Sequence, residues 1–424
     1  MERAPLNSAL ASHIVHRMGE GGQPPDRGIQ YVNVGNETYL RILRDEYLRR
    51  LLKAAHGSGF KLVQGYYGGG KTHFLYCVRD LAWDEGFPTA IVSLSPQECP
   101  YDDSVKVYRA VTMNITSPPP TDASRPSRGL TDILRDVADD RRNTLGDQDF
   151  KRWISQTAMR VAVDSHSFRR AAAEFMRAYS FGDDQKEAVL EAWLRGDPVT
   201  RTDVRELGIF ETIEKGNAFT MLRSMCQLLV EYGFPGSVLL FDEVDRNMSF
   251  SRTKIQALGD NLRQVIDLCG SALLPGVLFL YAVPPEFLRN VVPDYPALDQ
   301  RLKSPIPLSE RSPQAPVIDL EHLDLDMTSL LVRIGERLLE VFEAAEDWKS
   351  DRSIQSRNLQ ALAQTCTDFA FEIGHRRLFV KTWIDLLFRQ YRGEQRALLL
   401  EELERLLQDG VVALDSADST FIDA

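Results

Sequence analysis

The sequence predicts an α/β fold: a parallel sheet flanked by helices, with a large helical insert and a C-terminal helical lid. Short apolar runs alternate with segments of helical periodicity, which is the pattern of parallel strands covered on both faces. Only helical periodicity occurs at residues 121–207, and again beyond residue 326. Strands are expected at residues 60–63, 89–95, 237–241, 277–282 and 317–320.

Helices are expected before, between and after these strands. The chain divides into an N-terminal helical segment (1–58), a core (59–325, with the insert at about 121–207), a lid (326–410) and an acidic tail (411–424) whose end should fray. The expected helices are 7–17, 38–55, 73–81, 104–115, 130–142, 150–163, 167–179, 185–195, 218–232, 252–268, 327–344, 356–373, 377–389 and 395–407.

Composition limits the classes of function. A net charge of −11 over 424 residues argues against a surface that binds nucleic acid everywhere, so any contact with DNA has to be local. No apolar stretch reaches the length of a membrane span, and residues 1–21 lack the apolar core of a signal peptide. The five cysteines are far apart and are expected to be buried thiols. We therefore expect a cytoplasmic protein without a membrane partner.

The most specific motif is G-x-x-x-x-G-K-[ST] at residues 65–72, between the strand at 60–63 and the helix at 73–81. Glycines let backbone N–H groups approach a triphosphate closely, and the following helix directs its positive end toward the anion. Lys71 would reach the β- and γ-phosphates, and Thr72 would ligate Mg²⁺. This Walker A motif predicts ATP bound by Gly65, Tyr66, Tyr67, Gly68, Gly69, Gly70, Lys71, Thr72 and His73.

A second motif follows the apolar strand at 237–241, where Asp242 and Glu243 come at its carboxyl end. Ligands of open α/β sheets bind at this end of the strands. Asp242 would hold Mg²⁺ opposite Thr72, and Glu243 would polarise the water that attacks the γ-phosphate. Together with the upstream loop, the acidic pair has the pattern of a Walker B motif and predicts hydrolysis.

Hydrolysis also needs positive charge near the leaving phosphate. Two arginine clusters qualify by position: Arg301, and Arg376 with Arg377 at the start of a C-terminal helix. An arginine supplied across a subunit boundary can raise the rate by orders of magnitude. Position alone does not separate such an arginine from one in a surface ion pair.

The two motifs, a Tyr-Pro-x-Leu-x-x-Arg segment ending at Arg301 and the helical lid together resemble AAA+ ATPases of the origin-recognition (ORC-like) kind. Residues 60–75, the pair Val107-Tyr108 and the long helical insert more closely resemble the BREX phage-defence ATP-binding family, BrxC/BrxD. The likeness extends over about residues 31–388.

The resemblance implies an AAA+ ATPase of bacterial antiviral defence. It would act as a nucleotide-driven motor or switch, as a homo-oligomer, with other defence proteins such as a helicase and with DNA as a further partner. By the same resemblance Arg301 corresponds to an arginine finger, and Arg377 to the second sensor arginine of the lid.

One departure from the family pattern concerns the strand at 277–282, which should end in a polar sensor of the γ-phosphate. Val283 and Pro284 stand there instead, so either Glu286 substitutes in part or hydrolysis is slow. The alternatives are therefore an ATP-stabilised scaffold or adaptor with little turnover, and an ORC-like DNA initiator or helicase loader. A P-loop kinase is less favoured, because an Asp-Glu pair followed by a lid indicates water as the acceptor.

Overall fold

The computed structural model describes residues 6–94, 99–119, 126–242, 252–271, 274–304, 306–368, 374–393 and 395–422. The chain forms two compact units. Unit 1 contains residues 1–40, 63–77 and 318–424, and unit 2 contains residues 41–62 and 78–317. The chain passes from one unit to the other after residues 40, 62, 77 and 317, so neither unit is one continuous stretch of sequence.

The predicted sheet is confirmed. Its six strands have the order β3-β2-β4-β5-β1-β6. β2 pairs in parallel with β4, and β4 in parallel with β5, and every residue of β4 and β5 is buried. The strands are β1 (Gly59–Gln64), β2 (Thr89–Ser93), β3 (Ile115–Thr116), β4 (Ser237–Asp242), β5 (Val277–Val283) and β6 (Val317–Asp319).

β3 was not predicted. It pairs antiparallel with β2, through Thr89 with Thr116 and Ala90 with Ile115. A strand of two residues is too short to produce any periodic pattern, so sequence reasoning placed Ile115 at the end of a helix and Thr116 in no element.

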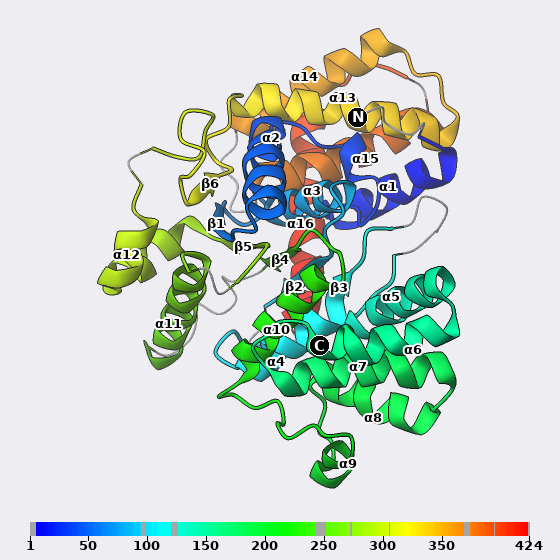
Figure 1. Cartoon of the computed structure of the whole chain (residues 1–424). Coiled ribbons are helices and arrows are strands. Elements are labelled where there is room, and N and C mark those ends of the chain that lie inside the picture. The colour runs from blue at the N-terminus through cyan, green and yellow to red at the C-terminus, as the bar shows by residue number, and fades with distance from the viewer. Residues whose placement is uncertain are drawn as a thin grey trace. The chain divides into compact units, whose positions relative to one another are not determined.

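Unit 2 carries the helical insert, as predicted. Its main helices are α5 (Leu130–Leu145), α6 (Asp147–Gln156), α7 (His166–Phe181) and α8 (Asp184–Arg195), which form one blue-green bundle in Figure 1. Their apolar faces join the core that also covers the sheet of this unit. The other helices of unit 2 are α4 (Ser104–Asn114), α9 (Arg201–Glu206), α10 (Ala218–Glu231), α11 (Arg252–Cys269) and α12 (Pro296–Leu302).

Unit 1 has a separate core, built by helices from both ends of the chain. α1 (Ser8–Gly21) packs against α13 (Met327–Glu346) and α15 (His375–Arg392), and α14 (Arg352–Asp368) and α16 (Leu400–Ile422) complete this part.

The remaining elements of the two units are α2 (Glu37–Ile42), α3 (Lys71–Asp84), the π-helical segments Leu43–Ala54 and Phe287–Val291, and the 3₁₀ turns Ile29–Tyr31, Ala158–Arg160 and Val292–Asp294.

Polar side chains cap the first turns of several helices, and a glycine follows the end of α1. Asn7 accepts the Leu10 N–H at the start of α1 (2.8 Å), and Gly22 takes a left-handed conformation (φ 62°) after its end. Ser165 and Asp183 cap α7 and α8 in the same way. These caps satisfy backbone groups that the helix itself leaves unpaired.

Three predictions about helices and thiols were wrong in detail. α6 ends at Gln156 and a 3₁₀ turn follows, whereas one helix had been expected over 150–163. α16 begins at Leu400 rather than 395 and continues to Ile422, so most of the tail that was expected to fray is helical. Cys269 is partly exposed, whereas the other four free cysteines are buried as predicted.

Candidate functional site

Residues 65–72, which we call the phosphate loop, connect β1 to α3. Gly68 (φ 72°) and Gly70 (φ 90°) have left-handed backbone conformations that other residues rarely adopt. The Gly69 N–H donates to Tyr66 O (3.0 Å), and the Phe74 N–H donates to Gly70 O (2.9 Å) as α3 begins. The loop is thus a tight turn that leads directly into a helix N-terminus, the arrangement that favours bound anions.

Lys71 is the first residue of α3, and its side chain folds back over the phosphate loop. Its Nζ donates to Gly65 O (2.9 Å) and to Tyr66 O (3.2 Å), and the residue is only 8% exposed. The ammonium group therefore lies at the first two residues of the loop. This is a site where a positive charge can meet an anion that the loop encloses.

Two side chains from distant parts of unit 1 contact the same loop. Glu321 Oε1 accepts the Tyr66 N–H (2.8 Å). Arg376 donates from Nη1 to Gly69 O and from Nη2 to Leu320 O (2.6 Å). Burial lowers the pKa of Arg376 from its usual range, and the negative charge of Glu321 acts in the opposite direction.

Packing, as well as backbone conformation, requires glycine at positions in the phosphate loop. A Cβ on Gly69 would lie 2.6 Å from Glu321 Oε1, and a Cβ on Gly65 would lie 3.3 Å from the same atom. A Cβ on Gly68 would lie 3.1 Å from the Cα of Gly374. Glycine at these positions therefore lets Glu321 and Gly374 pack directly against the backbone of the loop.

Arg377, the neighbour of Arg376, has different contacts. Its Nε donates to Gly21 O (2.8 Å), and its Nη1 donates to the hydroxyl of Tyr67 (2.6 Å). The guanidinium carbon also lies 5.5 Å from the centre of the Tyr67 ring. Arg376 thus contacts the backbone of the loop, whereas Arg377 contacts one of its exposed side chains and the end of α1.

His73 follows Thr72 on α3, and its Nε2 lies 3.3 Å from Asn33 Oδ1. Burial, and to a lesser extent the positive charge of Arg376, lower the pKa of His73 to about 4. The imidazole is therefore neutral at pH 7 and adds no charge to the loop. Asn33 Oδ1 also accepts from Asn36 Nδ2 (3.1 Å) and from the thiol of Cys77 (3.4 Å).

Asp242, the first carboxylate of the predicted Walker B pair, is the last residue of β4 in unit 2 and is 3% exposed. Its carbonyl oxygen accepts the Leu94 N–H (2.9 Å). Beneath it, the ring of Phe241 stacks on that of Tyr281 at 4.6 Å. Glu243 lies outside the described residues, so its predicted role stays a prediction.

Arg301 lies on α12 in unit 2, where its Nε donates to Asp267 Oδ1 (2.6 Å). The Arg301 side chain is 30% exposed to solvent. β5 ends at Val283, which is fully buried, and Pro284 follows. The strand end thus carries apolar side chains where a polar sensor was expected.

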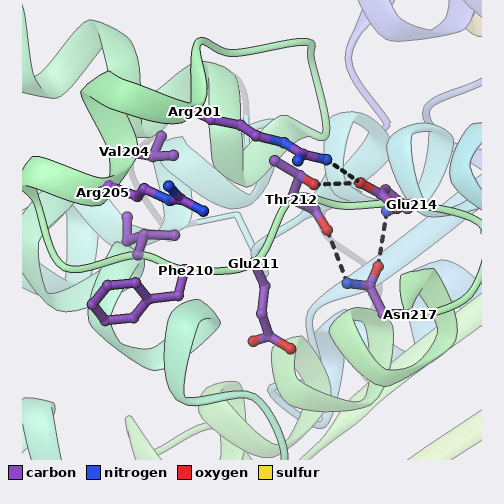
Figure 2. A pocket seen from close by; sticks show the side chains of 9 residues that line it. Arg201, Val204, Arg205, Phe210, Glu211, Thr212, Glu214 and Asn217 are labelled. Carbon is purple, nitrogen blue, oxygen red and sulfur yellow. Dashed lines mark hydrogen bonds and ion pairs between the residues drawn. The ribbon is translucent and has the colours of Figure 1, made fainter.

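Unit 2 also contains two cavities. One, of about 260 Å³, lies at α9 and the segment after it; Figure 2 shows that its polar groups bond to one another, with Arg201 and Thr212 on Glu214 and Asn217 on the Thr212 carbonyl. The other, of about 300 Å³, is lined by Arg301 and by Lys61 among others. Lys61 donates to Gln314 O (3.1 Å) and Ala315 O (2.5 Å).

Within the described residues, no group of three or more histidine, cysteine, aspartate or glutamate side chains could hold a metal ion. None of the helices in the described part of the chain combines the length and the apolar character that crossing a membrane requires.

Sequence reasoning missed Glu321 and did not give Arg376 a role separate from Arg377. Glu321 follows β6, the neighbour of β1 in the sheet. An acidic residue after the last short strand was the available signal, but only the strand order shows that this strand lies beside the one leading into the phosphate loop.

Comparison with known proteins identifies the family. The family model described as BREX system ATP-binding protein BrxC/D matches residues 7–398, which is most of the chain. No match was found among curated proteins or among solved structures. The match confirms the resemblance and agrees with a mixed α/β fold of AAA+ type. The chain belongs to the BrxC/BrxD family of BREX system ATP-binding proteins.

Proposed function

We propose that this ATP-binding protein is a Mg²⁺-dependent ATPase of AAA+ type that serves as a nucleotide-driven motor or switch in phage defence. The observation that carries the proposal is the position of Lys71, whose ammonium lies at the start of a glycine-rich loop that is preceded by a strand and followed by a helix. This combination favours binding of a triphosphate.

The proposed roles follow the chemistry of each side chain. Backbone N–H groups of the phosphate loop and Lys71 would bind the phosphates. Thr72 and Asp242 would hold Mg²⁺, which would neutralise charge that develops on the phosphate oxygens. Glu243 would orient the attacking water and accept its proton.

The arginines would supply further positive charge. Arg376 is the stronger candidate for the lid arginine, because it contacts the backbone of the phosphate loop and its buried Nε has no hydrogen-bond partner among the described residues. Arg377 would act through Tyr67. Arg301 would serve as an arginine finger in a neighbouring subunit of a homo-oligomer, after release from Asp267.

The partners are proposed from the family. A role in the BREX system implies work with other defence proteins, such as a helicase, in the cytoplasm and on DNA. With a net charge of −11, DNA binding would need a local basic surface or the channel of a ring.

The test is Glu243→Gln in the full chain, with Glu231→Gln as control, because Glu231 is an exposed residue at the end of α10. Glu243→Gln should still bind ATP and should lose turnover at least about 100-fold, since the amide cannot accept the proton of the attacking water. The control should hydrolyse ATP as the wild type does. Unchanged turnover in Glu243→Gln would refute the assignment.

A second candidate function is an ATP-stabilised scaffold with little turnover. The apolar end of β5, with buried Val283 followed by Pro284, favours it, because apolar residues stand where a polar sensor of the γ-phosphate is expected. Measuring ATP turnover of the wild type with and without DNA and partner proteins separates the two. Turnover that stays at the level in buffer would favour the scaffold.

A further inference from the structure

Glu321 lies in the bend after β6, and the structure fixes that bend from several sides. Its own N–H donates to Asp319 Oδ1 (3.0 Å), and the hydroxyl of Tyr39 donates to Asp319 O (3.0 Å). The Leu320 N–H donates to Gln64 O (2.9 Å) in the last residue of β1. These hydrogen bonds fix the backbone that carries the Glu321 carboxylate.

The carboxylate of Glu321 is directed at the phosphate loop. Oε1 accepts the Tyr66 N–H at 2.8 Å, and a Cβ on Gly69 would come within 2.6 Å of the same oxygen. One carboxylate oxygen therefore accepts from the Tyr66 end of the turn and occupies the space that a side chain at Gly69, the other end, would need. Tyr66 and Gly69 close this turn with their own hydrogen bond.

We propose that Glu321 is a positioning residue of the phosphate loop: it holds the Tyr66 end of the turn while Arg376 holds the carbonyl of Gly69. The proposal rests on ATP binding at this loop. Glu321 does not need to touch the nucleotide, because it acts on the backbone that does. A loop held in its binding conformation loses less entropy when it closes on a ligand, and this raises affinity.

A neighbouring positive charge offsets the negative charge of Glu321. A carboxylate close to a triphosphate is unfavourable unless a positive charge balances it, and the buried guanidinium of Arg376 donates beside it to Leu320 O. The hydrogen bond to Tyr66 needs only an acceptor oxygen, which glutamine also has. Loss of the acceptor and loss of the charge can therefore be separated by two substitutions.

The experiment measures binding of a fluorescent N-methylanthraniloyl ATP to the full chain with Mg²⁺. Glu321→Ala should weaken binding about ten-fold or more, because a charge-assisted hydrogen bond is lost and the Tyr66 N–H is left unpaired. Glu321→Gln should stay within about three-fold of the wild type, since the acceptor remains and repulsion of the phosphates falls. Glu336→Ala, at an exposed position on α13, is the matched control and should bind as the wild type does.

A second measurement guards against a general loss of folding. Hydrogen exchange of the Tyr66 amide should quicken at least about ten-fold in Glu321→Ala and stay slow in Glu321→Gln and Glu336→Ala. Wild-type affinity in Glu321→Ala, or equal weakening in Glu321→Ala and Glu321→Gln, would overturn the proposal. Wild-type affinity in Lys71→Ala would instead refute ATP binding at this loop, and so the two failures are distinguishable.

Discussion

A methyl group at Gly374 would collide with the phosphate loop. Gly374 is the residue before α15, and its backbone (φ −56°, ψ 124°) suits alanine as well as glycine. A Cβ there would lie well inside 3.0 Å of Tyr67 O and 2.9 Å from both the carbonyl carbon and the Cα of Gly68. The Gly374→Ala substitution therefore tests the contact between α15 and the loop without imposing backbone strain.

The size of the effect follows from the atoms involved. All of the close atoms belong to the backbone, so no side chain can rotate to make room, and either the loop or the start of α15 has to move. Overpacking of this kind costs about 1–3 kcal/mol. If nucleotide binding requires the loop and α15 in these positions, the same cost weakens binding by about five-fold to over a hundred-fold.

The assay is titration with the fluorescent ATP analogue, together with urea unfolding. Gly374→Ser keeps a good N-cap residue but carries the same Cβ, so it should weaken binding as alanine does. Gly216→Ala is the control, because a Cβ at Gly216 would meet nothing within 4 Å. Wild-type affinity and an unchanged urea midpoint in Gly374→Ala would show that α15 does not rest on the loop, and the reasoning would fail.

Two further predictions concern unit 2 and the thiols. Burial lowers the pKa of Lys61 to about 7. Between pH 7 and about 10, the unfolded state then holds a proton that the folded state lacks, so the free energy of unfolding should rise with pH by at most about 1.4 kcal/mol per unit, and Lys61→Met should abolish that rise. Burial raises the pKa of Cys226, Cys269 and Cys366 to about 12. These thiols should resist alkylation at pH 8 in the native protein and react quickly in urea. Fast native labelling of Cys226 or Cys366 would contradict their burial, whereas fast labelling of Cys269, which is partly exposed, would contradict its raised pKa.

The sheet could be predicted because its central strands are apolar along their whole length. Five of the six residues of β4 and all seven of β5 are apolar or small, and the structure buries every one. A strand covered on both faces needs such a run, so the pattern and the fold have the same cause. β3, with two residues, has no pattern of its own and forms only because β2 offers a free edge.

The contacts of the phosphate loop could be predicted only in part. The loop itself is a local pattern, and its lysine and glycines follow from chemistry that repeats among nucleotide sites. Glu321 and Arg376 reach it from 255 and 307 positions away along the chain, so the sequence around the loop does not show that these two residues contact it. Between Arg376 and Arg377 the choice depends on helical rotation, since successive residues of α15 point about 100° apart.

The hydrogen bonds of Arg376 connect three parts of unit 1 that sequence reasoning treated separately. One guanidinium donates both to the phosphate loop at Gly69 and to the end of β6 at Leu320, and it is carried by α15. If a bound nucleotide shifted the Gly69 carbonyl, its hydrogen bond to Arg376 would have to stretch or re-form, and we would then expect α15 to move with it. Such coupling would be reciprocal: a partner protein that bound α15 would change the nucleotide affinity by the same factor by which the nucleotide changed the affinity for the partner. Binding alone would then suffice to signal, and hydrolysis would be needed only to reset the loop, which is how a chain with an apolar end to β5 could still act as a switch.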